Sequence, residues 1–75
     1  NIIKNMSKIS NPHLRTIQLI NSFGFKPKKV AEILETSTQV IYNKMKMYER
    51  SKFTENDFLK LQKYIKETFY YFNLN

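Results

Sequence analysis

A cluster of polar side chains between residues 37 and 50 is suited to contact with a polyanion. Amide, hydroxyl, phenol and cationic groups recur there at spacings of three and four residues: Thr38, Gln39, Tyr42, Asn43, Lys46 and Arg50. No Asp or Glu occurs from residue 36 to residue 47, so nothing in this stretch repels phosphate. Gln and Asn are suited to paired hydrogen bonds with adenine, and Thr and Tyr can touch thymine methyls. The alternatives are a solvated polar face, a capping role for Thr38 and a phosphate contact for Tyr42.

Three further cations, Lys26, Lys28 and Lys29, crowd the start of a helix expected from Pro27. The positive end of the helix dipole disfavours cations there, at a cost of about 0.3–1 kcal/mol each. Such an arrangement needs a compensating interaction. The alternative is that the lysines are solvated, with their stems lying over apolar surface.

Groups for catalysis are sparse in this chain. It has one histidine, one glycine, no cysteine and six scattered carboxylates. No nucleophile with a base, metal cluster or phosphate-cradling glycine loop can be assembled from them. We therefore expect a protein that is not an enzyme, with no metal and no cofactor. His13, in the first turn of its helix, is expected on the surface.

Length and charge define the broad class. The 75 residues suffice for one domain with a small core, and 13 Lys and Arg against 6 Asp and Glu give a net charge of +7. Such an excess favours nucleic acid or an acidic membrane face as a partner. No apolar run approaches the roughly 20 residues of a membrane span, and no secretion signal is visible. The expectation is a cytoplasmic chain that is associated with the nucleoid through DNA and makes no membrane contact.

Local signals predict an all-α domain of four helices over residues 11–75, after a flexible arm at residues 1–10. Asn11 and Pro12 begin the first helix, which runs to Ser22 and is closed by Gly24. The second helix begins at Pro27 and covers about nine residues. Its inward face is Val30, Ala31, Ile33 and Leu34.

The third helix is expected over residues 38–48, capped by Ser37 or Thr38 after a break of about three residues. Its inward side is Ile41, Met45 and Tyr48, with Val40 at the edge. A long amphipathic fourth helix follows Thr54 and Asp57, which resemble a capping box. Its apolar stripe consists of Phe58, Leu61, Ile65 and Phe69, widened by Leu59, Tyr64 and Phe72.

The stretch VAEILETSTQVIYNKM, residues 30–45, resembles the helix-turn-helix DNA-binding proteins of the phage Cro and repressor type, also called XRE-like. That family has an apolar residue, an alanine and then a leucine in its first helix, and a β-branched residue or leucine within its second. Val30, Ala31, Leu34 and Ile41 occupy those positions. Glu35 stands where the family usually has glycine, and a left-handed glutamate would cost about 1–2 kcal/mol.

The resemblance implies sequence-specific binding of double-stranded DNA, with residues 38–48 as the recognition helix in the major groove. The base-reading residues would be Thr38, Gln39, Tyr42, Asn43 and Lys46, at a site rich in A·T pairs. The phosphate contacts would be Lys26, Lys28, Lys29, Ser37, Lys44 and Arg50, since the amino end of the second helix faces the DNA backbone.

Proteins of this type commonly act as homodimers on two-fold symmetric sites. Four consecutive aromatic residues, Phe69, Tyr70, Tyr71 and Phe72, form the candidate dimer interface. Alternatively, they cover the first helix and the arm. We expect a transcriptional regulator of phage or plasmid type, most simply a repressor. The alternatives are the DNA-binding domain of a larger recombinase, transposase or replication protein, and a basic protein- or membrane-interaction module without nucleic acid.

Overall fold

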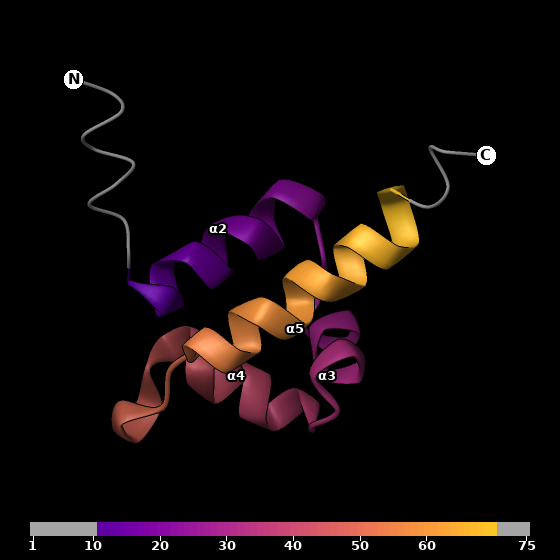
Figure 1. Ribbon diagram of the computed structural model, residues 1–75. Helices are drawn as coiled ribbons and strands as arrows, with labels where there is room; N and C mark the ends of the chain where they lie inside the picture. The colour runs from indigo at the N-terminus through magenta and orange to yellow at the C-terminus, as the bar shows by residue number, and fades with distance from the viewer. Residues whose placement is uncertain (1–10, 71–75) are drawn as a thin grey trace.

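Residues 11–70 are described by the computed structural model, and within that range the chain forms four α-helices and no strand (Figure 1). The helices are α2 (Pro12–Phe23), α3 (Pro27–Leu34), α4 (Thr38–Lys46) and α5 (Glu55–Ile65). A 3-10 turn, η1 (Tyr48–Arg50), follows α4, and a π-helical turn, η2 (Lys66–Tyr70), continues α5. The predicted all-α fold of four helices is thereby confirmed. The predicted arm at residues 1–10 lies outside the described residues.

Helix α2 begins and ends at the residues that its capping signals indicate. The Asn11 side chain accepts a hydrogen bond from the His13 N–H at 2.8 Å, and Pro12 is the first helical residue. At the other end Gly24 is left-handed, with φ 66°, and the Phe25 N–H donates to the Ile20 carbonyl at 3.0 Å. This is the closing geometry for which glycine is preferred.

The turn between α3 and α4 has the same geometry without a glycine. Glu35 has φ 59° and ψ 49°, and the Thr36 N–H donates to the Ala31 carbonyl at 2.9 Å. The left-handed conformation is therefore kept at the expense of backbone strain in Glu35. Ser37, rather than Thr38, caps α4, because its hydroxyl accepts a hydrogen bond from the Val40 N–H.

The end of α4 differs from the prediction. The helix stops at Lys46 instead of continuing to residue 48, because Met47 is left-handed with φ 57° and turns the chain away from the helix axis. Tyr48, expected in the core, is 57% exposed, and Arg50 lies in η1 rather than on α4. Phe53, which was not among the predicted core residues, is 1% exposed and fills the interior instead.

The core draws on all four helices and on Phe53. Its fully buried members are Ile20, Val30, Ala31, Leu34, Ile41, Phe53 and Leu61. Ile33 and Met45 pack at its edge, which confirms the inward faces predicted for α3 and for most of α4. Leu59 is exposed, contrary to the prediction, since two residues before Leu61 lies on nearly the opposite side of a helix.

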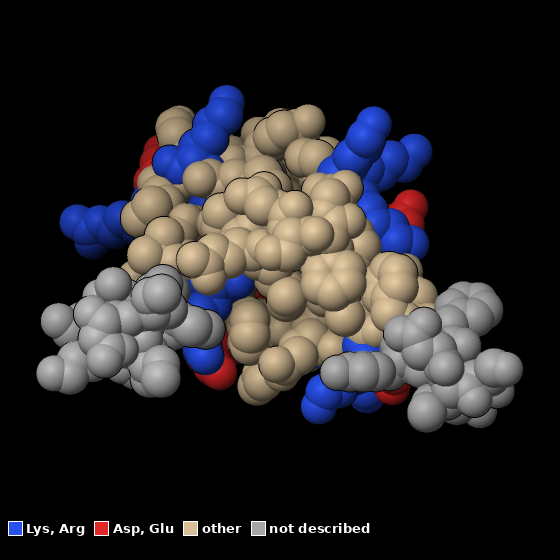
Figure 2. All heavy atoms as spheres, turned by 90° about the horizontal axis from the view of Figure 1, so that it is seen from above, with Lys and Arg blue, Asp and Glu red and all other residues tan. Residues whose placement is uncertain are grey.

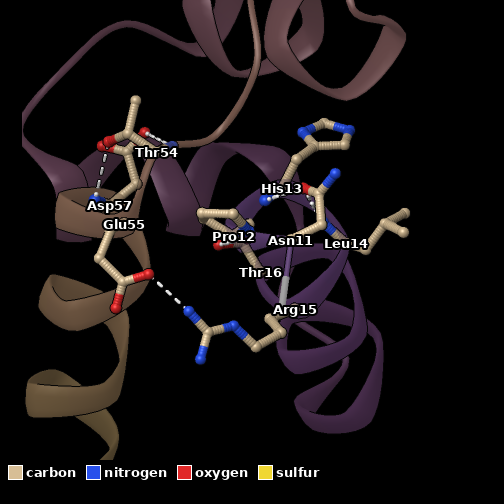
Figure 3. A network of polar contacts seen from close by, with 9 residues as sticks. All are labelled: Asn11, Pro12, His13, Leu14, Arg15, Thr16, Thr54, Glu55 and Asp57. Atoms are coloured by element: carbon tan, nitrogen blue, oxygen red, sulfur yellow. Dashed lines mark hydrogen bonds and ion pairs between the residues drawn. The ribbon is translucent and has the colours of Figure 1, made fainter. Parts of the chain in front are cut away.

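Helices α2 and α5 lie side by side and run in the same direction (Figure 1). Arg15 forms an ion pair with Glu55 near their starts, and the Phe23 and Phe69 rings meet at 5.3 Å near their ends. Figure 3 shows the starting end, including the predicted capping box of Thr54 and Asp57, whose two hydrogen bonds are 3.0 and 3.2 Å long. None of the helices within residues 11–70 has the length and apolar character needed to cross a membrane.

Candidate nucleic-acid interface

One side of α4 is free of the core and carries four of the predicted base-reading residues. Gln39, Tyr42 and Lys46 are exposed and Asn43 is half-buried, whereas Ile41 points into the interior. At about 100° per residue these four side chains span roughly 100° of the helix circumference. We call them the polar face of α4. Thr38 is half-buried at the first position of the helix.

Two members of the polar face are joined directly. The Gln39 Nε2 donates a hydrogen bond to Asn43 Oδ1 at 3.0 Å, across one helical turn. The Gln39 Oε1 and one Nε2 hydrogen are not used by this bond. The structure therefore couples two side chains that the sequence suggested as independent contacts.

Lys44 lies on the other side of α4, against α5. Its ammonium is 2.7 Å from the Asp57 carboxylate, and the two side chains are 22% and 14% exposed. Partial burial acts to raise the pKa of Asp57, but hydrogen bonds from Lys44 and Thr54 outweigh it and hold that pKa below its usual value. Lys44, predicted as a phosphate contact, is thus used within the fold, and we leave it out of the interface.

The three lysines at the start of α3 differ in their surroundings. Lys26, Lys28 and Lys29 line an open hollow of about 350 Å³, together with Gly24, Phe25 and Glu32. The Lys29 ammonium lies 5.2 Å from the Tyr64 ring centroid, and the hydrogen bond with Tyr64 raises the pKa of Lys29. Lys26 and Lys28 are exposed and pair with no carboxylate in the described part of the chain. The first turn of α3 contains no acidic residue.

The remaining predicted phosphate contacts lie at the two ends of α4. Ser37 is exposed and uses its hydroxyl oxygen as the cap of the helix. Arg50 is exposed but lies beyond the left-handed Met47, so it does not continue the polar face. Its contact with phosphate stays a prediction.

His13 is buried, so the prediction of a surface histidine is wrong. It is 5% exposed, its Nδ1 accepts a hydrogen bond from the Phe53 N–H at 3.1 Å, and the two rings stack at 5.6 Å. Burial, followed by the nearby charge of Lys52, lowers the pKa of His13. Its partner is a backbone group 40 residues away along the chain, which no local pattern could reveal.

The side of the molecule formed by α2 carries little charge. Viewed from above, its centre is covered by uncharged residues, with Lys and Arg around the edge (Figure 2). Arg15 is the one charged residue in α2, and it pairs with Glu55. The excess of positive charge is therefore carried by the other elements, including α3 and α4.

The predicted dimer interface is described only in part. Phe69 is partly exposed and contacts Phe23, which itself stacks on Phe25 at 5.7 Å. Phe69 thus covers the end of α2 to some extent, as the alternative reading of the aromatic run expected. Tyr70 ends η2, whereas Tyr71 and Phe72 lie outside the described residues.

Comparisons with protein-family models, curated proteins and solved structures find no match to this chain.

Proposed function

We propose that the protein binds double-stranded DNA sequence-specifically, as a helix-turn-helix protein of the Cro and repressor type does. The observation that carries the proposal is the polar face of α4: it is exposed and free of carboxylates, and it holds two amides, a phenol and an ammonium. A surface that only kept the protein soluble would usually mix both signs of charge. This face offers hydrogen-bond donors and acceptors for base edges and nothing that repels phosphate.

In the proposed complex α4 lies in the major groove. An α-helix with its side chains is about 10–12 Å wide, which matches the roughly 12 Å width of that groove. Gln39 is the second residue of α4, so it belongs to the leading end that reaches the bases in this arrangement. Amides suit adenine and Tyr42 suits a thymine methyl or a phosphate, which favours a site rich in A·T pairs.

The start of α3 would bind the DNA backbone. Lys26 and Lys28 are unpaired cations beside free helical N–H groups, and a phosphate in the hollow between them would interact with both. Binding would remove the unfavourable interaction between these cations and the helix dipole. Lys29 would contribute less, because it already interacts with Tyr64 and lies 3.8 Å from Glu32.

The biological role that fits is a cytoplasmic transcriptional regulator that acts by occupying an operator, without chemistry of its own. One α4 covers only a few base pairs, so we propose a homodimer on two half-sites about 34 Å apart. The aromatic run that begins at Phe69 is the proposed contact between the two copies.

The test is the salt dependence of duplex binding by three proteins: wild type, Lys28→Ala and Lys66→Ala. Both variants lose one positive charge, but Lys66 follows Tyr64 by two residues and therefore points away from α3. Lys28→Ala should weaken binding to cognate and scrambled duplexes alike and flatten the slope of log affinity against log salt by about one unit. Lys66→Ala should leave the slope nearly unchanged.

Two results would argue against the proposal. Absence of duplex binding by the wild type at low salt would remove the function itself. Equal effects of the two variants would show that overall charge, and not the start of α3, governs binding.

A further inference from the structure

The hydrogen bond between Gln39 and Asn43 gives these two residues unequal roles. Gln39 is exposed and lies near the leading end of α4, whereas Asn43 is half-buried one turn later. We infer that Asn43 is a positioning residue that holds the Gln39 carboxamide ready to read one A·T base pair. This inference rests on the proposed function and assigns a division of labour within the polar face.

The hydrogen-bonding groups of a carboxamide permit both contacts at once. Paired recognition of adenine needs an acceptor for the N6 amino group and a donor for N7. Gln39 offers Oε1 and the Nε2 hydrogen on the same edge for this purpose. The second Nε2 hydrogen remains for Asn43 Oδ1, so the contact seen at 3.0 Å leaves the base-reading edge available.

Prior orientation of Gln39 also favours binding. A glutamine side chain has three rotatable bonds, and their freedom is lost when the amide contacts a base. An amide that is already held in place loses less freedom on binding. Asn43 is shorter and half-buried, so it provides a firmer support than another exposed long side chain.

Asn43 is less suited to read a base itself. Its own paired contact with adenine would require Oδ1, the atom that accepts the hydrogen bond from Gln39. The competing explanation is that the pair merely stabilises α4, as amide pairs four residues apart can do. These two explanations differ in what removal of Asn43 does to base preference.

The experiment is selection of bound duplexes from a random pool by wild type, Gln39→Ala, Asn43→Ala and the double variant. Gln18→Ala, an exposed glutamine on α2, is the matched control. Gln39→Ala should reduce the preference for one A·T pair by about five- to a hundredfold. Asn43→Ala should reduce the preference at that same pair by a smaller factor, and the double variant should equal Gln39→Ala. Circular dichroism would establish that each variant keeps its helices.

A further variant, Gln39→Glu, sharpens the test because it retains a partner for the Asn43 amide but offers only acceptors to a base. It should shift the preference at the same position towards cytosine. Relaxation of a different base pair by Asn43→Ala would overturn the inference, as would an unchanged base preference with reduced helix stability. Wild-type binding without any sequence preference would also overturn it while leaving duplex binding intact. Absence of duplex binding would instead remove the proposed function.

Discussion

The two sides of α4 use lysine in opposite ways. Lys44, on the side that faces α5, is largely buried and lies 2.7 Å from Asp57. Lys46, two residues later and on the polar face, is exposed and pairs with no carboxylate among residues 11–70. The net charge of +7 does not distinguish them. The comparison teaches that a cation paired inside the fold contributes to stability, whereas an unpaired cation on a free face is available to a partner.

The largest effect is expected from the interior beneath Lys44. Phe53 is 1% exposed, and the Lys44 ammonium lies 5.9 Å from its ring centroid. Phe53→Ala would leave a cavity and should lower the free energy of unfolding by about 3–5 kcal/mol. Chemical denaturation monitored by circular dichroism measures this change. A loss below about 1 kcal/mol would contradict the core assignment.

The two lysines themselves form the sharpest matched pair. Lys44→Ala removes the partner of a mostly buried carboxylate and should cost about 1–3 kcal/mol of stability. Lys46→Ala should change stability by less than about 0.5 kcal/mol, because it alters an exposed side chain. The order should reverse for affinity to duplex DNA, where Lys46→Ala has the greater effect at salt concentrations that leave both proteins folded. The same order in both measurements would break the comparison.

A smaller effect should appear as a dependence of stability on pH. The pKa of His13 in the folded protein lies below the ordinary value of 6.5, because burial disfavours the charged ring and Lys52 adds to the shift. The unfolded chain therefore takes up the proton first, so the stabilisation is complete above pH 6.5 and decreases as the pH falls below it. The contribution of Asp57 is lost only below its ordinary pKa of 3.8.

Thermal unfolding at a series of pH values would measure this dependence. His13→Asn is the control, since its side-chain oxygen can still accept the Phe53 N–H but does not titrate. The variant should show a flatter profile between pH 5 and pH 7. Identical profiles for the two proteins would assign the dependence to another group.

The smallest effect concerns the turn that leads into α4. Glu35 has the left-handed conformation that Gly24 adopts at the end of α2. Glu35→Gly removes a backbone cost of about 1–2 kcal/mol but gives the unfolded chain more freedom, so the net gain should be about 1 kcal/mol or less. A higher midpoint of unfolding with unchanged duplex affinity would fit. A lower midpoint would show that Glu35 is not strained.

The comparison also shows what the sequence could reveal. The helix starts at Pro12, Pro27 and Glu55 and the end at Gly24 depend on neighbouring residues, so capping patterns predicted them. The polar face of α4 followed from helical periodicity in the same way. The end of α4, by contrast, depends on Met47 and on the route that brings Phe53 into the core.

Contacts between distant residues were beyond the reach of local patterns. His13 is buried because a backbone group 40 residues later lies against it, and Lys44 is paired because Asp57 returns to it on α5. Each side chain alone looked like an ordinary surface group. Only the packing of the helices decides which polar residues are used inside the fold.

The central claim is that the polar face of α4 and the start of α3 together form the DNA-binding surface. Backbone amide chemical shifts recorded during titration with a duplex at low salt test it most directly. The account predicts perturbations at Gln39, Asn43 and Lys46 and at Lys28, with no change at Leu14 and Gln18 on the uncharged side of α2. Perturbations confined to α2 or α5, or none at all, would contradict it.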